Sequence, residues 1–460
     1  MRGLAMVLMA LSHSQDFWYA WDDSAELGQR WVTHWTELAT PTFLSLGGMM
    51  MAVAAMRRRE RGRSLWSSRL FYIRRGAVLI ILDQTWASFW FSGPRDYWGS
   101  FWHRFLHSTS VWRPLGLHWF AWAAAGLFAL WFLVRALVWT WRGGIGAQAL
   151  RFASVQFLLA ALSAGAVIAG LRLYEPLPFV KLDDNDIFYF GILSCTGSSM
   201  IVAALLFRLP GPVLIALGWA LLRWYPDLAR HFDDLLDRWP GQIMHKIGTD
   251  GRPWLVSQAR HVLFGGDAAV DFPLAVWMGF LVQGLGFGRL FVWLDARRWR
   301  AWPVFLIAGL MLMGLFIHDR VRVTGLTGET HKNVFQGTGL QEWALGFLHA
   351  RKYPPSWDYC LGMGAVIFTA LSLLMIRFLH RDAVWTPLRV LQAFGRVPLF
   401  FYLAHLPLIA SLDHFTDVST DLSLSSAVLI WLAVLALLLY PCRFHHWLKR
   451  TRRWKWLHYV

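Results

Sequence analysis

The sequence predicts an all-α membrane protein, a polytopic bundle of about 11–12 spanning helices. Hydrophobic residues make up 56% of the 460 residues, whereas charged residues make up only 16%. The chain also has 30 Trp and 33 Phe, and Trp favours the membrane–water boundary, which accommodates both its apolar ring and its N–H donor. Apolar runs close to the ~20 residues that cross a bilayer recur along the chain. We therefore expect one helical membrane domain rather than several soluble domains.

A short apolar run at residues 2–12 opens the chain, and longer predicted spans follow it. In chain order they are residues 38–56, 76–92, 115–140, 152–172, 187–207, 209–224, 272–293, 302–317, 358–377, 388–412 and 425–442. The 209–224 segment is short, and a re-entrant segment is the alternative there. We assign residues 1–412 to the main transmembrane domain and residues 413–460 to the last helix and a basic tail.

The opening run has two interpretations. A helix over residues 2–12 would rise only ~17 Å, which is short of the ~30 Å of hydrocarbon in a bilayer. One Arg, a short apolar core and the small residues Ala10 and Ser12 have the format of a cleaved signal peptide. The other interpretation is a retained first helix whose N-terminal part is missing, and the resemblance described below favours it.

Charges in the loops predict the orientation of the bundle. The basic segment "MRRRERGRSLWSSRLFYIRR" is expected on the cytoplasmic side, and alternate counting places the C-terminal tail "CRFHHWLKRTRRWKWLHYV" there as well. The acidic loops "DDSAELGQRW", "KLDDNDIF" and "DHFTDVSTD" then fall on the outer side.

Two long loops are expected on this outer, periplasmic side. The first, at 225–270, contains the amphipathic stretch "PDLARHFDDLLDRW", which we expect to lie on the membrane surface as a covering helix. The second, at 318–357, is polar and rich in Gly and Thr, and long loops of this kind are often functional. It is a candidate lid or acceptor site.

The composition also argues against several classes of protein. A net charge of +16 is compatible with nucleic-acid binding, but the basic residues cluster in short loops between apolar runs, so we expect no nucleic-acid partner. Cys195, Cys360 and Cys442 form no CxxC pair, so neither a disulfide framework nor a metal site is expected. The sequence has no GxSxG, HExxH or Walker motif.

Ionisable residues in or beside apolar spans are the candidate catalytic residues, because such groups are costly in a membrane and mark function by default. They are His13, Asp16, His34, Glu37 and His405. The topology places all of them near the outer face. His titrates near physiological pH, and a carboxylate can orient its ring, so this set suits proton transfer from an amine or hydroxyl. The same groups could bind a metal or relay protons, and a single interfacial His could simply hydrogen-bond a carbonyl.

Several blocks of the sequence resemble one bacterial membrane family. They are "RGLAMVLMALSHSQDF", "ATPTFLSLGG", "DFPLAVWMGFLVQGLGFGRL", "RKYPPSWDY" and "LQAFGRVPLFFYLAHL". This family is similar to the catalytic domain of heparan-alpha-glucosaminide N-acetyltransferase, within the transmembrane acyltransferase superfamily. The resemblance spans residues 2 to about 410 and implies a bundle of about a dozen or fewer helices. It also implies that the opening run is the outer part of a retained first helix.

The resemblance implies transfer of an acetyl or acyl group from cytoplasmic acetyl-CoA, or another acyl-CoA, to a glycan or envelope acceptor outside. His34 is the best match in kind to the catalytic histidine of the family, His13 matches a polar residue that closes the first helix, and His405 matches a histidine of the last block. Relatives read "THxxAPxF" where this chain reads "THWTELATPTF", so Glu37 falls at a His position when Pro41 is aligned. The identity of the base is therefore open between these residues.

The phosphates of acyl-CoA are expected to favour the Arg-rich inner surface, including "RRRERGR", and Arg74, Arg75 and Arg396 are the candidate donor-binding residues. Orientation and binding of anionic lipid account for these arginines equally well. No metal is expected as a cofactor.

The resemblance and the charge pattern thus predict an acyltransferase of a bacterial inner membrane with a cytoplasmic C-terminus. The alternatives are a transporter or permease, which the Gly and Pro breaks in 272–293 and 388–412 favour, or a family member that has lost catalysis. Membrane lipids are expected partners, and the sequence leaves a homodimer open.

Overall fold

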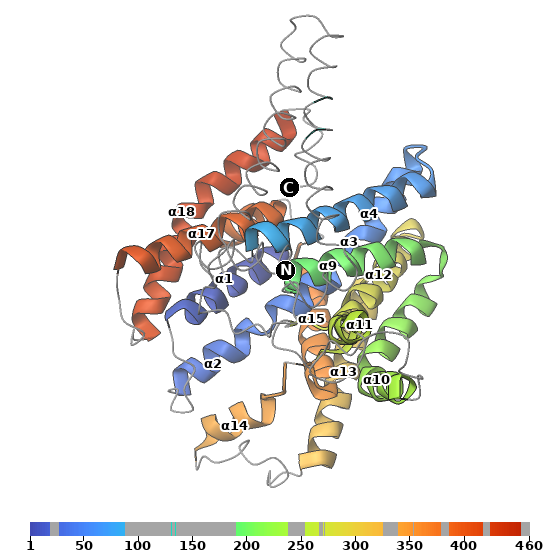
Figure 1. Ribbon diagram of the computed structural model, residues 1–460, viewed down its shortest axis with the longest axis horizontal. Helices are drawn as coiled ribbons and strands as arrows, with labels where there is room; N and C mark the ends of the chain where they lie inside the picture. The colour runs from blue at the N-terminus through green and yellow to red at the C-terminus, as the bar shows by residue number, and fades with distance from the viewer. Residues whose placement is uncertain are drawn as a thin grey trace, which may run out of the picture.

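The computed structural model describes residues 1–18, 27–87, 130, 134, 190–237, 254–265, 270, 272–324, 339–352, 354–378, 386–416 and 424–451. Every regular element in this part of the chain is a helix, so the predicted all-α fold is confirmed (Figure 1). The elements are α1 (Arg2–Trp18), α2 (Leu27–Thr36), α3 (Ala39–Glu60), α4 (Leu65–Leu82), the π-helix η1 (Asp83–Ala87), α9 (Ile192–Leu205), the 3₁₀ turn η2 (Leu206–Arg208), α10 (Gly211–Asp237), α11 (Trp254–Phe264), α12 (Leu274–Ala296), α13 (Trp302–Thr324), α14 (Leu340–Leu348), α15 (Trp357–Phe378), α16 (Thr386–Arg396), α17 (Pro398–Thr416) and α18 (Leu424–Thr451).

Five helical segments in the described ranges are long and apolar enough to cross a membrane. They are Arg30–Glu60, Leu274–Ala296, Trp302–Arg322, Trp357–Ile376 and Ala427–Thr451. Each coincides with a span predicted from the sequence, and shorter apolar helices cover Ile192–Arg208 and Pro398–Ile409. The chain is therefore a helical membrane bundle. The spans predicted at 115–140 and 152–172 lie outside the described residues, apart from two isolated positions.

The span predicted at 388–412 is wrong in one respect, because it is two helices. Helix α16 ends at Arg396 and α17 begins at Pro398. Proline has no backbone N–H to continue a helix, and it disfavours the helical conformation of the residue before it, here Val397. The break redirects the chain, so α16 packs mainly on α1 and α18 while α17 also packs on α1.

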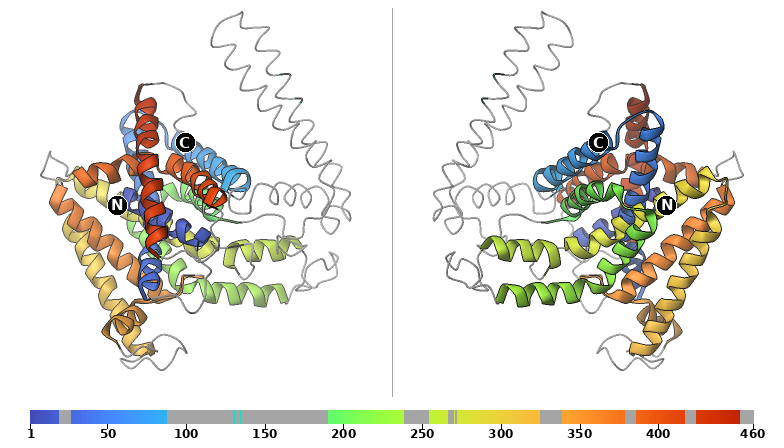
Figure 2. Two further views of the ribbon diagram at one scale, coloured as in Figure 1. Left: turned by 90° about the vertical axis from the view of Figure 1, so that its left-hand side faces the viewer. Right: turned by 90° about the vertical axis from the view of Figure 1, so that its right-hand side faces the viewer.

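Two other elements begin or end differently from their predictions. Helix α4 begins at Leu65, well before residue 76, because the Ser64 side chain caps it by accepting a hydrogen bond from the Ser67 amide at 3.1 Å. Helix α10 continues to Asp237 through Pro226, so the amphipathic stretch predicted as part of a separate surface loop extends the preceding span. Helix α11 lies beside it (Figure 2), joined by an Arg260–Asp233 ion pair at 3.0 Å and by Phe232 against Phe264.

Helix α12 is the centre of the larger packed body, and glycines on two of its faces bring neighbouring backbones close. On one face, a Cβ on Gly284 would lie 2.1 Å from the Ser45 carbonyl oxygen of α3, and a Cβ on Gly288 would lie 2.6 Å from that of Met49. On the other face, Gly279 lies against Gly218 of α10. Small residues at such spacing let membrane helices pack by close van der Waals contact. Gly76 of α4 and Gly197 of α9 make the same kind of contact.

A buried arginine fixes the segment that follows α14. The Arg320 side chain is only 4% exposed and forms an ion pair with Asp358 at 3.0 Å. Its guanidinium also donates to the carbonyl oxygens of Gly346 and Phe347, which are in the last turn of α14. Because the last carbonyls of a helix have no partner within it, these bonds hold α14 against α13 and α15. The contacts thereby position residues 349–352 beside the core.

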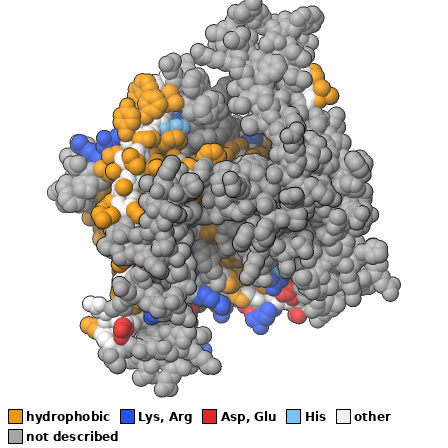
Figure 3. Space-filling view, turned by 60° about the vertical axis from the view of Figure 1, so that its left-hand side comes forward, with side chains coloured by type: hydrophobic (Ala, Val, Ile, Leu, Met, Phe, Trp, Pro, Cys, Tyr) orange, Lys and Arg blue, Asp and Glu red, His pale blue; other side chains and the backbone are white. Residues whose placement is uncertain are grey.

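Exposed apolar side chains identify faces that meet lipid. On α13 they include Ile307, Leu310 and Met311, and on α18 they include Leu429 and Tyr440. Figure 3 brings forward the side of the molecule where α18 lies in Figure 1, and a band of hydrophobic side chains is visible there. Exposure of such a surface to water would be unfavourable, whereas in a bilayer the apolar side chains contact lipid tails.

Candidate functional site

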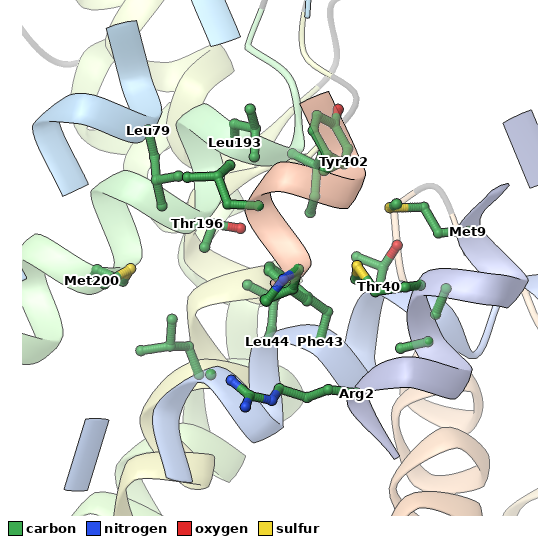
Figure 4. Close-up of a pocket in the computed structure, with 18 of the residues that line it drawn as sticks. Arg2, Met9, Thr40, Phe43, Leu44, Leu79, Leu193, Thr196, Met200 and Tyr402 are labelled. Carbon is green, nitrogen blue, oxygen red and sulfur yellow. The ribbon is translucent and has the colours of Figure 1, made fainter. Parts of the chain in front are cut away.

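A cavity of about 530 Å³ lies between α1, α3, α4, α9 and α17, and we call it the central cavity. Its walls are mainly apolar: Met9, Phe43, Leu44, Leu79, Leu193 and Met200 surround its middle (Figure 4). Arg2 lies at one end of the view and Tyr402 at the other. Arg2 and His13 both line the cavity from α1, and the helix rises ~17 Å from one to the other. The cavity is therefore long, with chemically different ends.

One end of the central cavity is cationic, and we call it the arginine end. Arg2, Arg58 and Arg75 line it, with Tyr72 between the last two along the wall. The charges of Arg2 and Arg75 act on each other, and both act on Lys449 of α18. The Arg58 guanidinium stacks 3.7 Å over the Phe71 ring. Like charges gathered beside an apolar cavity favour a polyanionic ligand.

The other end contains two histidines, and we call it the histidine end. His13 lines the cavity, and its ring centroid is 5.3 Å from that of the fully buried His405. Nδ1 of His405 is 2.6 Å from the Tyr402 carbonyl oxygen and 3.2 Å from that of Phe401. A carbonyl only accepts, so the neutral ring carries its hydrogen on Nδ1 and leaves Nε2 as an acceptor. This Nε2 is buried and has no partner in the described part of the chain.

Asp83 also lines the histidine end, and its contacts are mainly structural. The side chain is 1% exposed, and Oδ2 accepts a hydrogen bond from the Gly191 amide at 3.0 Å. The carboxylate also accepts from the Leu193 and Ser194 amides and from the Ser194 hydroxyl. These amides form the N-terminus of α9, where backbone N–H groups lack helical partners and favour a negative charge. Asp83 thus caps α9 from a different helix.

We expect Asp83→Ala to lower the free energy of unfolding by about 1–2 kcal/mol, as the loss of a helix cap does. Asp83→Asn keeps an acceptor oxygen and should recover part of this loss. Asp295→Ala, at an exposed carboxylate near the end of α12, is the matched control and should have little effect. Thermal unfolding of the purified variants in detergent measures this, and equal midpoints for Asp83→Ala and Asp295→Ala would exclude the capping role.

His34 and Glu37 lie apart from the central cavity. His34, in the last turn of α2, lines a smaller cavity of about 50 Å³ together with Asp358 and Tyr359. Glu37 is in the turn before α3, and its backbone carbonyl accepts a 2.8 Å hydrogen bond from the Tyr359 hydroxyl. The Glu37 carboxylate is an electrostatic neighbour of Lys352, which does line the central cavity. Neither residue lines the central cavity, but Glu37 lies close to one residue that does.

The remaining predicted site residues are dispersed. Arg75 lines the central cavity, but Arg74 is exposed and does not. Arg396 is exposed at the end of α16 and lines a different groove. Asp16 belongs to α1, and its side chain lies outside the described part of the structure.

The sequence interpretation missed Arg2, Lys352 and Tyr402 as lining residues. Arg2 looked like an ordinary flanking charge, and Tyr402 looked like one aromatic among many. Lys352 is within the "RKYPPS" block that resembles the acyltransferase family, and this resemblance was the available signal for it.

His349 follows α14, near the small cavity. Its pKa is lowered by burial and then by the charges of Arg320 and Arg30, which favours the neutral imidazole.

No protein-family model, curated protein or solved structure matches the chain. Among the residues that the structure describes, no group of three or more His, Cys, Asp or Glu side chains could hold a metal ion. The site is therefore defined by its own geometry: an elongated apolar cavity with guanidinium groups at one end and, at the other, the imidazole of His13 with His405 packed behind it.

Proposed function

We propose that the protein is an integral membrane acyltransferase that moves an acyl group from acyl-CoA to a glycan or envelope acceptor. The observation that carries this proposal is the central cavity, which joins three arginines to His13 through one apolar passage. The resemblance of the quoted sequence blocks to transmembrane acyltransferases supports the same reaction. Both reactants of such a transfer need contact with one site from different sides of the bundle.

The donor would bind by its charged part at the arginine end. Arg2, Arg58 and Arg75 offer charge-assisted hydrogen bonds to phosphates, and an arginine fork suits phosphate oxygens in particular. The apolar middle of the cavity suits the less polar arm that carries the thioester. Asp83 is the acidic residue among the described residues lining the cavity, and it lies at the opposite end from these arginines.

His13 would act as the general base at the histidine end. Its imidazole removes a proton from the acceptor amine or hydroxyl while the acceptor heteroatom attacks the thioester carbonyl carbon. The new C–N or C–O bond forms, the C–S bond breaks, and the thiolate leaves with the proton that His13 returns. His405 is a positioning residue, because it packs behind the His13 ring and is itself fixed through Nδ1.

The proposed orientation follows from the same charges. Arg58, in the last turn of α3, and Arg75, in α4, belong to the basic segment of residues 56–75, which we expect on the cytoplasmic side. In this orientation the arginine end opens toward cytoplasmic acyl-CoA, the histidine end meets the outer acceptor, and the C-terminus is cytoplasmic. A bacterial inner membrane is the expected location.

A permease is the second candidate, and the break between α16 and α17 favours it. Pro398 and Leu399, directly after the break, line the central cavity, and interrupted membrane helices commonly build transport sites. Uptake of a solute into proteoliposomes without any acyl-CoA would support this alternative.

The donor site is tested by comparing two adjacent arginines. We expect Arg75→Gln to weaken acetyl-CoA binding by about tenfold, because one charge-assisted hydrogen bond to phosphate is lost. Arg74→Gln is the matched control and should bind as the unchanged protein does, because Arg74 lies outside the cavity. Isothermal titration of purified protein with acetyl-CoA measures both. Absence of binding by the unchanged protein would contradict the proposal, and equal weakening by both substitutions would contradict the assigned site.

A further inference from the structure

A second space, which we call the lateral groove, opens between α1, α15 and α16. Its volume is about 490 Å³. Leu374 and Met375 of α15 form one apolar wall, and Leu388 and Leu391 of α16 form the other. Arg2 lines both this groove and the central cavity, so the groove lies at the level of the arginine end.

The walls of the groove belong to two different hydrophobic clusters. Leu391 packs with the core cluster formed by α1, α16, α17 and α18, whereas Met375 packs with the cluster formed by α3, α12, α13 and α15. Helices α1 and α16 are in backbone contact, since a Cβ on Gly3 would lie 1.8 Å from the Leu391 carbonyl oxygen. Helix α15 instead packs mainly on α13. In a membrane protein, a groove with apolar walls favours binding of a lipid acyl chain.

The polar lining of the groove is cationic. The Arg396 guanidinium is exposed there and donates a 3.4 Å hydrogen bond to Gln392, which lines the same groove. The charge of Arg396 acts on His446 of α18, and Arg2 is an electrostatic neighbour of Lys449. None of the described residues that line the groove is acidic. Among the described lining residues, a negatively charged head group would therefore meet favourable charges.

We propose that the lateral groove binds an anionic phospholipid, with the phosphate at Arg396 and an acyl chain between α15 and α16. Basic pockets between transmembrane helices commonly recognise anionic head groups. The apolar walls favour a lipid acyl chain, and the Arg396 guanidinium favours a negatively charged head group. The occupant is therefore a membrane lipid rather than a soluble anion. This inference stands on the groove alone and does not rest on the proposed acyl transfer.

Native mass spectrometry of delipidated full-length protein, incubated with phosphatidylglycerol or phosphatidylcholine, tests the inference. We expect the unchanged protein to retain phosphatidylglycerol several-fold better. Arg396→Gln should weaken phosphatidylglycerol binding about fivefold and leave phosphatidylcholine unchanged, because one charge near the membrane surface contributes about 1 kcal/mol. Arg443→Gln, at an exposed arginine of α18 outside the groove, is the charge control.

A second pair of variants tests whether the apolar walls of the groove bind the lipid acyl chain. Leu388→Trp fills the groove and should weaken binding of both lipids, whereas Leu373→Trp, at an exposed position of α15 that does not line the groove, should not. Thermal unfolding in detergent checks that each variant is folded. Equal retention of the two lipids by the unchanged protein would overturn the proposal. It would also be overturned if Leu388→Trp had no effect, or if inorganic phosphate displaced phosphatidylglycerol fully, since a soluble anion would then be the ligand.

Discussion

Replacing His13 by alanine is expected to slow the proposed acyl transfer by about 10²–10⁴-fold, the range that removal of a general base produces. His13 lines the central cavity, and its ring stands between the cavity and the buried His405. Without the imidazole, the acceptor loses the proposed base, and the Asp83 carboxylate at the same end is already bonded to the amides of α9. The rate of thiol release from acetyl-CoA in the presence of an amine acceptor measures the effect, and acetyl-CoA binding should remain because the arginine end is unchanged.

Two histidine variants serve as controls for this result. His34→Ala should retain most of the activity, because His34 lines the separate small cavity. His231→Ala, at an exposed position of α10, should retain all of it. A protein in which His34→Ala abolishes transfer and His13→Ala does not would place the base in the small cavity and refute the assignment to His13.

Replacing Gly284 by alanine is expected to lower the free energy of unfolding by roughly 3 kcal/mol. The added Cβ would lie 2.1 Å from the Ser45 carbonyl oxygen and 2.8 Å from its carbonyl carbon. These are backbone atoms of α3, so the clash cannot be relieved by rotating a side chain and the two helices must separate. That movement would also lengthen the hydrogen bond from Gln283 Nε2 to Ser45 Oγ, now 3.2 Å.

Gly314→Ala is the matched control for this substitution. Gly314 is also in a membrane helix, α13, but a Cβ there meets nothing within 4 Å. Alanine is the better helix former, so this variant should be as stable as the unchanged protein or slightly more stable. Thermal unfolding of both variants in detergent compares them directly. Equal midpoints would mean that α3 and α12 are not in backbone contact.

The helical fold could be predicted from the sequence because apolar runs of sufficient length are a local property. The ends of the helices were less predictable, since they depend on single residues such as Ser64 and Pro398. The close packing of α12 on two neighbours was not predicted either. A glycine in an apolar run has several possible partners, and only the three-dimensional arrangement shows that Gly284 meets Ser45.

The candidate site could be predicted only in part, because the residues that line a cavity are brought together by the three-dimensional arrangement of the helices. His13 and His405 stood out as polar groups in apolar runs, and the fold brings their rings together from opposite ends of the chain. His34 looked equally suitable, but its side chain lines the small cavity together with residues of α15 and does not line the central cavity. The adjacent residues Arg74 and Arg75 also could not be distinguished from the sequence. Arg75 lines the cavity and Arg74 does not, and their positions on the surface of α4 decide this.

The cap that Asp83 places on α9 has a consequence for how the protein is made. Asp83 and Gly191 are 108 positions apart in the sequence, and α4 packs closely on α9. At a synthesis rate of ~5–20 residues per second, α4 leaves the ribosome roughly 5–20 s before its partner does. During that interval a carboxylate within an apolar helix has neither its backbone amides nor its packing surface. The capped arrangement of α4 and α9 can therefore form only after α9 has been translated and inserted.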